Sequence, residues 1–129
     1  MKTKKKLLLD VDEVICFSGY LEVINEFLNT NYDIDYFEEY YLDSVVIPKN
    51  RFNEYNEFLN KKNLYENPVM LPNSIEIIKK LNEVYDIYIC SSCINPYNIN
   101  GSSRIFIDKF NFLIKTLPFI NPEKFIFTG

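Results

Sequence analysis

The chain has 129 residues, and 47% of them are hydrophobic, which is enough to form the core of one compact domain. It contains no histidine, so Ser-His-Asp triads, Cys-His dyads and zinc sites with histidine ligands are excluded. Its three cysteines are too few for a disulfide framework or for a zinc site of four thiolates. Its formal charge of −4 argues against nucleic acid as a partner, since nucleic-acid-binding modules usually carry a basic face. The chemistry that remains is that of carboxylates, hydroxyls, thiols, lysines and metal ions held by carboxylates.

The N-terminus resembles a signal peptide only superficially. Lysines precede the apolar run at 7–9, but Asp10, Asp12 and Glu13 interrupt this run before it reaches the roughly 7 to 15 apolar residues of a secretory signal. No stretch approaches the ~20 apolar residues of a membrane-spanning helix. We therefore expect a cytoplasmic protein with reduced thiols and without a membrane partner.

The first half of the chain begins with a predicted strand and continues with helical patterns. Residues 5–10 form a short, continuously apolar run that ends in an acidic residue, which is typical of an inner strand of a parallel sheet. Helical spacing follows at 18–30, with Ser18 as its N-cap. Two further helices are expected at 35–43 and 50–62, where aromatic and polar residues are mixed.

The second half of the chain alternates between helices and strands. A helix is expected after Asn73 or Ser74, and residues 84–90 form a second, mostly buried strand. A helix over 102–117 and a third strand over 125–127 follow. This order of elements predicts an α/β protein with a parallel sheet.

Acidic and hydroxyl side chains stand at the ends of the first two predicted strands. Asp10 and Asp12 follow the first strand, and Ser91 and Ser92 follow the second. Ligands of parallel α/β sheets bind beyond the carboxyl ends of the strands. Two close carboxylates repel each other, so Mg²⁺ would relieve the repulsion and would neutralise a phosphate substrate. One carboxylate can attack phosphorus while the other acts as general acid and then base, and a hydroxyl can hold the phosphoryl oxygens.

These two segments resemble motifs of the haloacid dehalogenase-like phosphohydrolases. Residues 7–14, LLLDVDEV, are similar to the first motif, an apolar strand that ends in Asp-x-Asp-x-Thr/Val. Residues 88–92, YICSS, are similar to the second motif, an apolar strand that ends in Ser or Thr. Within this superfamily both segments are most similar to the 5′(3′)-deoxyribonucleotidases. The resemblance implies a three-layer, Rossmann-like core formed by 1–16 and 72–129, incomplete at the C-terminus, with a small helical cap at 17–71.

The resemblance also implies a function and a set of site residues. The function is Mg²⁺-dependent hydrolysis of a phosphomonoester, a (deoxy)nucleoside monophosphate, through an aspartyl-phosphate intermediate. Asp10 would be the nucleophile and a magnesium ligand, and Asp12 would be the general acid/base, with its backbone carbonyl as a second ligand. Ser91 would hydrogen-bond the phosphoryl group, with the Ser92 backbone nearby. Aromatic residues of the cap would stack on the nucleobase, and the candidates are Phe17, Tyr20, Tyr40 and Tyr41.

Two further groups that the resemblance implies are not found in the sequence. The third motif of the family is a lysine, expected after the strand at 125–127, and the fourth is an acidic pair on another strand beside the first. Lys115 and Lys124 precede the strand and fit the third motif poorly, and Asp108 stands alone on a helix. We therefore expect an incomplete active site. A bare apolar edge beside the first strand would favour edge pairing, for example in a homo-oligomer.

Two other functions stay open. Without the lysine and the acidic pair, the chain would be a catalytically incomplete remnant that binds phosphate or a partner protein. Cys90-x-x-Cys93 follows a strand, as in thioredoxin-like proteins, so a thiol-disulfide oxidoreductase is the third hypothesis. In those proteins the motif opens a helix, whereas residues 94–98 indicate a loop. A buried strand cysteine with an incidental neighbour is the simpler interpretation.

Overall fold

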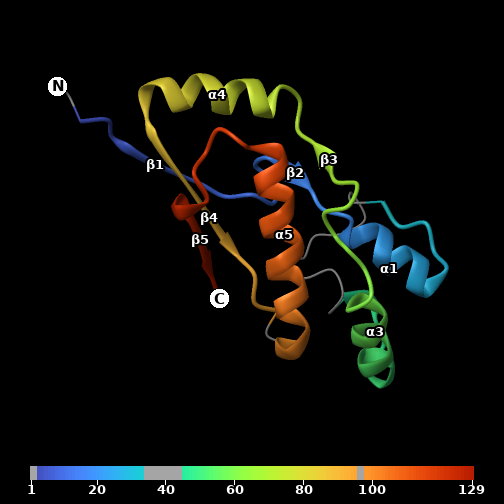
Figure 1. Cartoon of the computed structure of the whole chain (residues 1–129). Helices are drawn as coiled ribbons and strands as arrows, with labels where there is room; N and C mark the ends of the chain where they lie inside the picture. Colours follow the sequence, from blue (N-terminus) through green and yellow to red (C-terminus); the bar gives the residue numbers. More distant parts are fainter. Residues whose placement is uncertain (1–2, 34–44, 96–97) are drawn as a thin grey trace.

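The protein folds around a parallel sheet, seen here in a computed structural model that describes residues 3–33, 45–95 and 98–129 (Figure 1). The sheet has three strands in the order β1-β4-β5, with the bounds β1 (Lys6–Leu9), β4 (Asp86–Ser92) and β5 (Phe125–Thr128). Leu9 pairs with Ile89, and Ile89 also pairs with Phe125, so β4 is the central strand. The predicted α/β, Rossmann-like fold class is confirmed.

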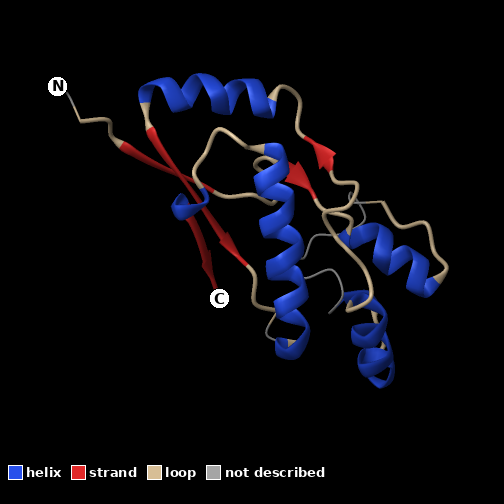
Figure 2. Ribbon diagram, viewed as in Figure 1, coloured by secondary structure: helices blue, strands red, loops and turns tan. Residues whose placement is uncertain are grey.

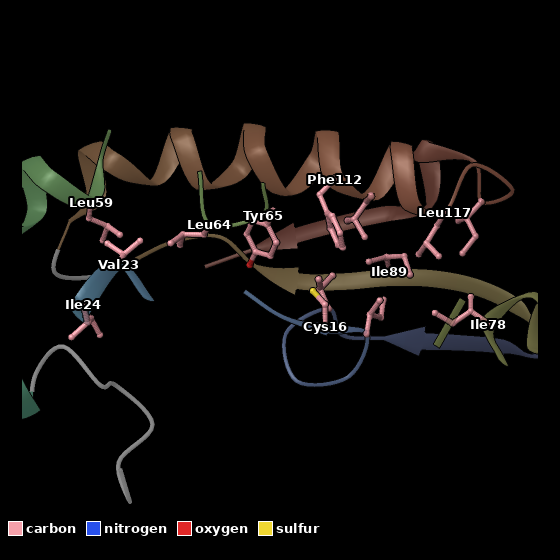
Figure 3. Close-up of a cluster of buried hydrophobic side chains, with 14 of the residues drawn as sticks. Cys16, Val23, Ile24, Leu59, Leu64, Tyr65, Ile78, Ile89, Phe112 and Leu117 are labelled. Atoms are coloured by element: carbon pink, nitrogen blue, oxygen red, sulfur yellow. The ribbon is translucent and has the colours of Figure 1, made fainter. Parts of the chain in front are cut away.

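Helices connect the parallel strands and cover one face of the sheet. α4 (Ser74–Val84) precedes β4, and α5 (Ser102–Thr116) lies between β4 and β5. Right-handed crossovers that move in one direction across a sheet place their helices on the same face. Figure 3 shows the resulting core, where Ile78 of α4, Ile89 of β4 and Leu117 after α5 belong to one buried cluster. No helix within the described ranges is long and apolar enough to cross a membrane.

The opposite face of the sheet is more exposed. Side chains alternate between the two faces of a strand, so Leu8, Tyr88 and Ile126 point away from α5. Leu8 is 61% exposed and Ile126 is 40% exposed. In the part of the chain that the structure describes, β1 has a partner strand on one side only. The expected association through this edge stays a prediction.

Between β1 and α4 the chain leaves the sheet and returns to the same place. Two short strands, β2 (Cys16–Phe17) and β3 (Val69–Met70), pair in antiparallel orientation and bring the two ends of this excursion together. Figure 2 shows the helices of the excursion on the side of the molecule away from the three-stranded sheet. Within the described residues, the helical elements of the excursion are α1 (Tyr20–Leu28), η2 (Lys49–Arg51) and α3 (Phe52–Leu59), while η3 (Ile99–Gly101) and η4 (Pro122–Lys124) flank α5 in the crossover from β4 to β5. The division into a core and a cap stays a prediction.

The predicted elements that fall within the described residues exist, but several of their ends differ. Gly19 occupies the N-cap position of α1 without a side-chain hydrogen bond, so Ser18 is not the cap. Asn73 precedes α4 in the left-handed conformation and its side chain makes no capping bond either. The helix predicted at 50–62 is divided into η2 and α3, and the helix predicted at 35–43 lies outside the described residues. β2 and β3 were not predicted, because strands of two residues are too short to show an alternating pattern.

Candidate functional site

A tight loop directly after β1 carries both predicted aspartates. Val11 is fully buried, and its carbonyl accepts hydrogen bonds from the N–H groups of Ile15 (2.9 Å) and Cys16 (3.3 Å). Glu13 adopts the left-handed conformation with φ 65°, and its N–H donates to the carbonyl of Cys16 at 2.8 Å. Asp10 is exposed, and its Oδ1 accepts the N–H of the next residue at 2.7 Å. The loop therefore fixes the backbone around Asp12 and leaves the carboxylate of Asp10 accessible at the carboxyl end of β1.

The end of β4 lies beside this loop. Leu9 pairs with Ile89, so Ser91 stands two residues beyond a paired position. Ser91 is 3% exposed and points to the face that α5 covers, as Ile89 does. Ser91 and Ser92 belong to β4 itself, because they pair with Phe127 and Thr128 of β5. The prediction that both polar strand ends meet at one edge of the sheet agrees with this register.

A lysine that the sequence analysis did not select connects the two strand ends. Lys109 lies on α5 and its side chain is 1% exposed. Its Nζ donates to Asp12 Oδ2 at 3.0 Å. It also donates to Ser91 Oγ at 2.8 Å and to the carbonyl oxygen of Ser92 at 2.7 Å. An ammonium group has three hydrogens to donate, so all of them are used. Lys115 and Lys124 were the lysines considered near the site from the sequence, whereas Lys109 is a lysine that reaches it.

A buried tyrosine completes the contacts of Asp12. The hydroxyl of Tyr65 donates to Asp12 Oδ1 at 2.7 Å, so each carboxylate oxygen accepts from a different residue. Tyr65 is 6% exposed, and Figure 3 shows it between α5 and the sheet, close to Phe112. The centroids of these two rings are 5.6 Å apart. The Nζ of Lys109 lies 5.4 Å from the Tyr65 centroid, within the range of a cation–π contact.

Burial and the charge of Asp12 shift the pKa values of neighbouring groups. Burial, together with the nearby Asp12, raises the pKa of Tyr65, so the phenol stays a donor. Burial and then Asp12 raise the pKa of Cys16 to about 11, although Lys109 acts in the opposite direction. Burial also raises the pKa of Cys93, again against Lys109. Reactive thiols have a lowered pKa, so the shift at Cys93 argues against the oxidoreductase hypothesis.

The position of Lys109 follows the helical spacing of buried residues on α5, but a hydropathy pattern assigns a lysine to the surface. Lys109 lies four residues after Ile105 and four residues before Leu113, on the stripe of α5 that faces the sheet. Phe106 and Ile114, two apolar residues of the same helix, are 45% and 40% exposed, so hydropathy alone does not identify the stripe that is buried. Sequence spacing gave no comparable signal for the tyrosine, which is separated from Asp12 by 53 positions.

The other residues named from the sequence lie elsewhere. Asp108 pairs with Arg104, with 2.8 Å between Nε and Oδ2. Lys124 pairs with Asp86 at the amino end of β4. Among the proposed base-stacking residues, Phe17 is 41% exposed on β2 and Tyr20 is half-buried at the first position of α1. Tyr40 and Tyr41 lie outside the described residues. Contact of these aromatic residues with a base stays a prediction.

Oxygen atoms at this edge of the sheet fit a magnesium ion better than a thiol-bound metal. Mg²⁺ usually keeps several waters and takes one or two carboxylates together with substrate phosphate. Asp10 offers an accessible carboxylate, whereas both side-chain oxygens of Asp12 accept hydrogen bonds. No described residue donates a hydrogen bond to the backbone carbonyl of Asp12, so this oxygen suits a ligand. Within the described ranges no three acidic or thiol side chains cluster as a metal site.

Known proteins resemble the chain over nearly its whole length. A Staphylococcus epidermidis protein provisionally named 5′(3′)-deoxyribonucleotidase is 26% identical over an alignment of 129 residues, which covers 98% of this chain and 68% of that protein. A Staphylococcus aureus protein with the same provisional name is 24% identical, and the alignment covers 98% of this chain and 67% of that protein. No family model matches the chain.

Proposed function

We propose that the protein is a Mg²⁺-dependent phosphomonoester hydrolase of the haloacid dehalogenase-like superfamily that acts on nucleoside monophosphates. The observation that carries this proposal is the buried Lys109, which joins Asp12 and Ser91 at the carboxyl end of the sheet. This edge is where parallel α/β sheets bind ligands, and a fixed cation beside a hydroxyl suits a phosphoryl group. The names of the Staphylococcus relatives support a nucleotide as the carrier of that group.

The proposed reaction is a double displacement at Asp10. A carboxylate oxygen of Asp10 attacks phosphorus, the bond between phosphorus and the ester oxygen breaks, and Asp12, which enters the cycle carrying a proton, gives that proton to the leaving oxygen. A water molecule then attacks the phosphorus of the aspartyl-phosphate while Asp12 takes a proton from that water. The bond between phosphorus and the Asp10 oxygen breaks, which releases inorganic phosphate and regenerates both aspartates.

The remaining residues would stabilise the charge on the phosphoryl oxygens. Lys109 and the hydroxyl of Ser91 are fixed to each other at 2.8 Å, so a phosphoryl oxygen meets donors that are already oriented. A phosphoryl oxygen would take the place of one of the acceptors that Lys109 now has. Mg²⁺, held by Asp10 and the carbonyl of Asp12, would neutralise further negative charge when bound.

The substitution Asp10→Asn tests the nucleophile. Asparagine keeps the shape of the side chain but lacks the attacking carboxylate, so we expect kcat to fall by about 10³-fold or more. Release of inorganic phosphate from a panel of nucleoside 5′- and 3′-monophosphates, with and without Mg²⁺, measures the effect. The matched control is Asp86→Asn, the same chemical change at the amino end of β4, which should leave kcat within about twofold. Turnover that persists in Asp10→Asn would contradict the assignment.

A phosphate-binding protein without turnover is the second candidate. It is favoured by the pair of Lys109 and Ser91, whose charge and hydroxyl suit phosphoryl oxygens whether or not an ester bond is cleaved. Calorimetric titration with inorganic phosphate distinguishes the two functions. Binding that disappears in Lys109→Met, without phosphate release from any nucleotide, would identify the binding protein.

A further inference from the structure

Tyr65 reaches Asp12 from a part of the chain that is anchored independently of it. The N–H of Tyr65 donates to Asn63 Oδ1 at 2.8 Å, and the neighbouring carbonyl of Leu64 accepts the N–H of Gly19 at 2.7 Å. These bonds tie the segment 63–65 to itself and to the start of α1. The backbone position of Tyr65 is therefore set by contacts that do not involve Asp12.

The ring of Tyr65 is fixed as firmly as its backbone. The residue is 6% exposed and packs on Phe112 of α5, with 5.6 Å between the centroids. Lys109 of the same helix places its Nζ 5.4 Å from the Tyr65 centroid. A phenol has few rotatable bonds and loses little conformational freedom when its ring is packed. The hydroxyl of Tyr65 thus has a defined position against which Asp12 is oriented.

The two donors on Asp12 come from different elements and bind different oxygens. Tyr65, from the segment after α3, donates to Oδ1 at 2.7 Å, and Lys109, from α5, donates to Oδ2 at 3.0 Å. A carboxylate with a single donor can still rotate about its last bond, but one held at both oxygens keeps its plane. A buried tyrosine hydroxyl commonly finds some partner, yet here the partner is the one oxygen of Asp12 that the lysine leaves free.

We propose that Tyr65 is a positioning residue for Asp12, which aligns the general acid/base only while the segment 63–65 is docked against α5. The inference rests on the proposed function, in which Asp12 transfers the proton. It adds that catalysis depends on how the excursion between β2 and β3 is positioned. Tyr65 itself would not contact the substrate.

The first test is the substitution Tyr65→Phe, which removes only the hydroxyl. We expect kcat on a nucleoside monophosphate to fall about tenfold while KM stays within about twofold, because a misaligned Asp12 slows the chemical step and leaves binding intact. The control is Tyr55→Phe, another buried tyrosine, which should change neither constant. Thermal melts of both variants show whether the fall in kcat is accompanied by a loss of stability. A higher KM at constant kcat, or an unchanged kcat, would overturn the proposal.

The second test does not depend on activity. The side-chain ¹³C carboxyl resonance of Asp12, identified by its loss in Asp12→Asn, should shift in Tyr65→Phe and stay in place in Tyr55→Phe. If the resonance shifts although the wild-type chain releases no phosphate, the proposed hydrolase function fails and the positioning of Asp12 stands. A resonance that does not move would refute the positioning role whether or not the protein is an enzyme.

Discussion

A lysine–aspartate ion pair lies at each end of the parallel sheet, and the two pairs differ in their access to water. At the carboxyl end the side chain of Lys109 is 1% exposed, and that of its partner Asp12 is 38% exposed. At the amino end the side chains of Lys124 and Asp86 are 35% and 28% exposed. The ammonium of Lys109 has exchanged water for protein acceptors, whereas that of Lys124 keeps part of its hydration. The same two residue types therefore form a buried ion pair at one end, whose ammonium depends on protein acceptors, and an ordinary surface ion pair at the other.

Breaking the buried pair from its acidic side should have the largest effect on stability. Asp12→Leu leaves Lys109 as an unpaired buried charge with only Ser91 and the Ser92 carbonyl as acceptors, which should cost about 3–5 kcal/mol in the free energy of unfolding. Urea unfolding at neutral pH measures this cost. Lys109→Met should cost much less, because Asp12 keeps its contact with water and with Tyr65. Equal losses in the two variants would show that the burial of the ammonium does not set the cost.

The pH dependence of stability should reflect the raised pKa of Cys16, whose thiol is buried near the charges of Asp12 and Lys109. The thiol has an ordinary pKa of 9.0, and in the folded protein burial and Asp12 raise its pKa to about 11. Between these values the unfolded chain loses the proton first, so this contribution to stability falls as the pH rises from 9 to 11. The slope is about 1.4 kcal/mol per pH unit at full effect. Urea unfolding of wild type and Cys16→Ala across this range should give a shallower curve for the variant, and parallel curves would contradict the shift.

The exposed pair should give the smallest effect. The hydrogen bond to Asp86 raises the pKa of Lys124, so the stabilisation is fully present below the pKa of an unfolded lysine and is lost as the pH rises through the folded pKa. Lys124→Met should therefore lower stability slightly at neutral pH, and its difference from wild type should vanish at strongly alkaline pH. Thermal unfolding at both pH values measures it. A loss as large as that of Asp12→Leu would mean that exposure to water does not determine how much stability is lost when each ion pair is broken.

The sequence predicted those parts of the molecule in which neighbouring residues share one environment. The runs at 5–10 and 84–90 read as strands because inner strands of a parallel sheet are apolar on both faces. Ser91 and Ser92 were placed just after the strand, and they fall inside β4 because pairing with β5 decides where a strand ends. The existence of the strands could therefore be inferred more reliably than their bounds.

The contacts within the site were less predictable for a physical reason. Lysine is rarely buried unless it is paired, so a hydropathy pattern assigns Lys109 to the surface even though it lies on the buried stripe of α5. Its partner Asp12 is 97 positions away, and Tyr65 reaches the same carboxylate from 53 positions away. Such long-range pairs follow from how the elements pack, which residue spacing does not encode.

The pairing of β2 with β3 has a consequence for how this fold can change. Because Cys16 pairs with Met70, the chain between them leaves the α/β part and re-enters it at almost the same point. A loop closed in this way tolerates a change of length at an entropic cost of only about 0.6 kcal/mol per doubling. The returning strand is less free, since Leu71 donates to the Ile15 carbonyl at 3.0 Å and Tyr65 binds Asp12. The fold should therefore tolerate insertions and deletions in the part of the excursion that follows β2. The part that leads into β3 should keep its length and Tyr65.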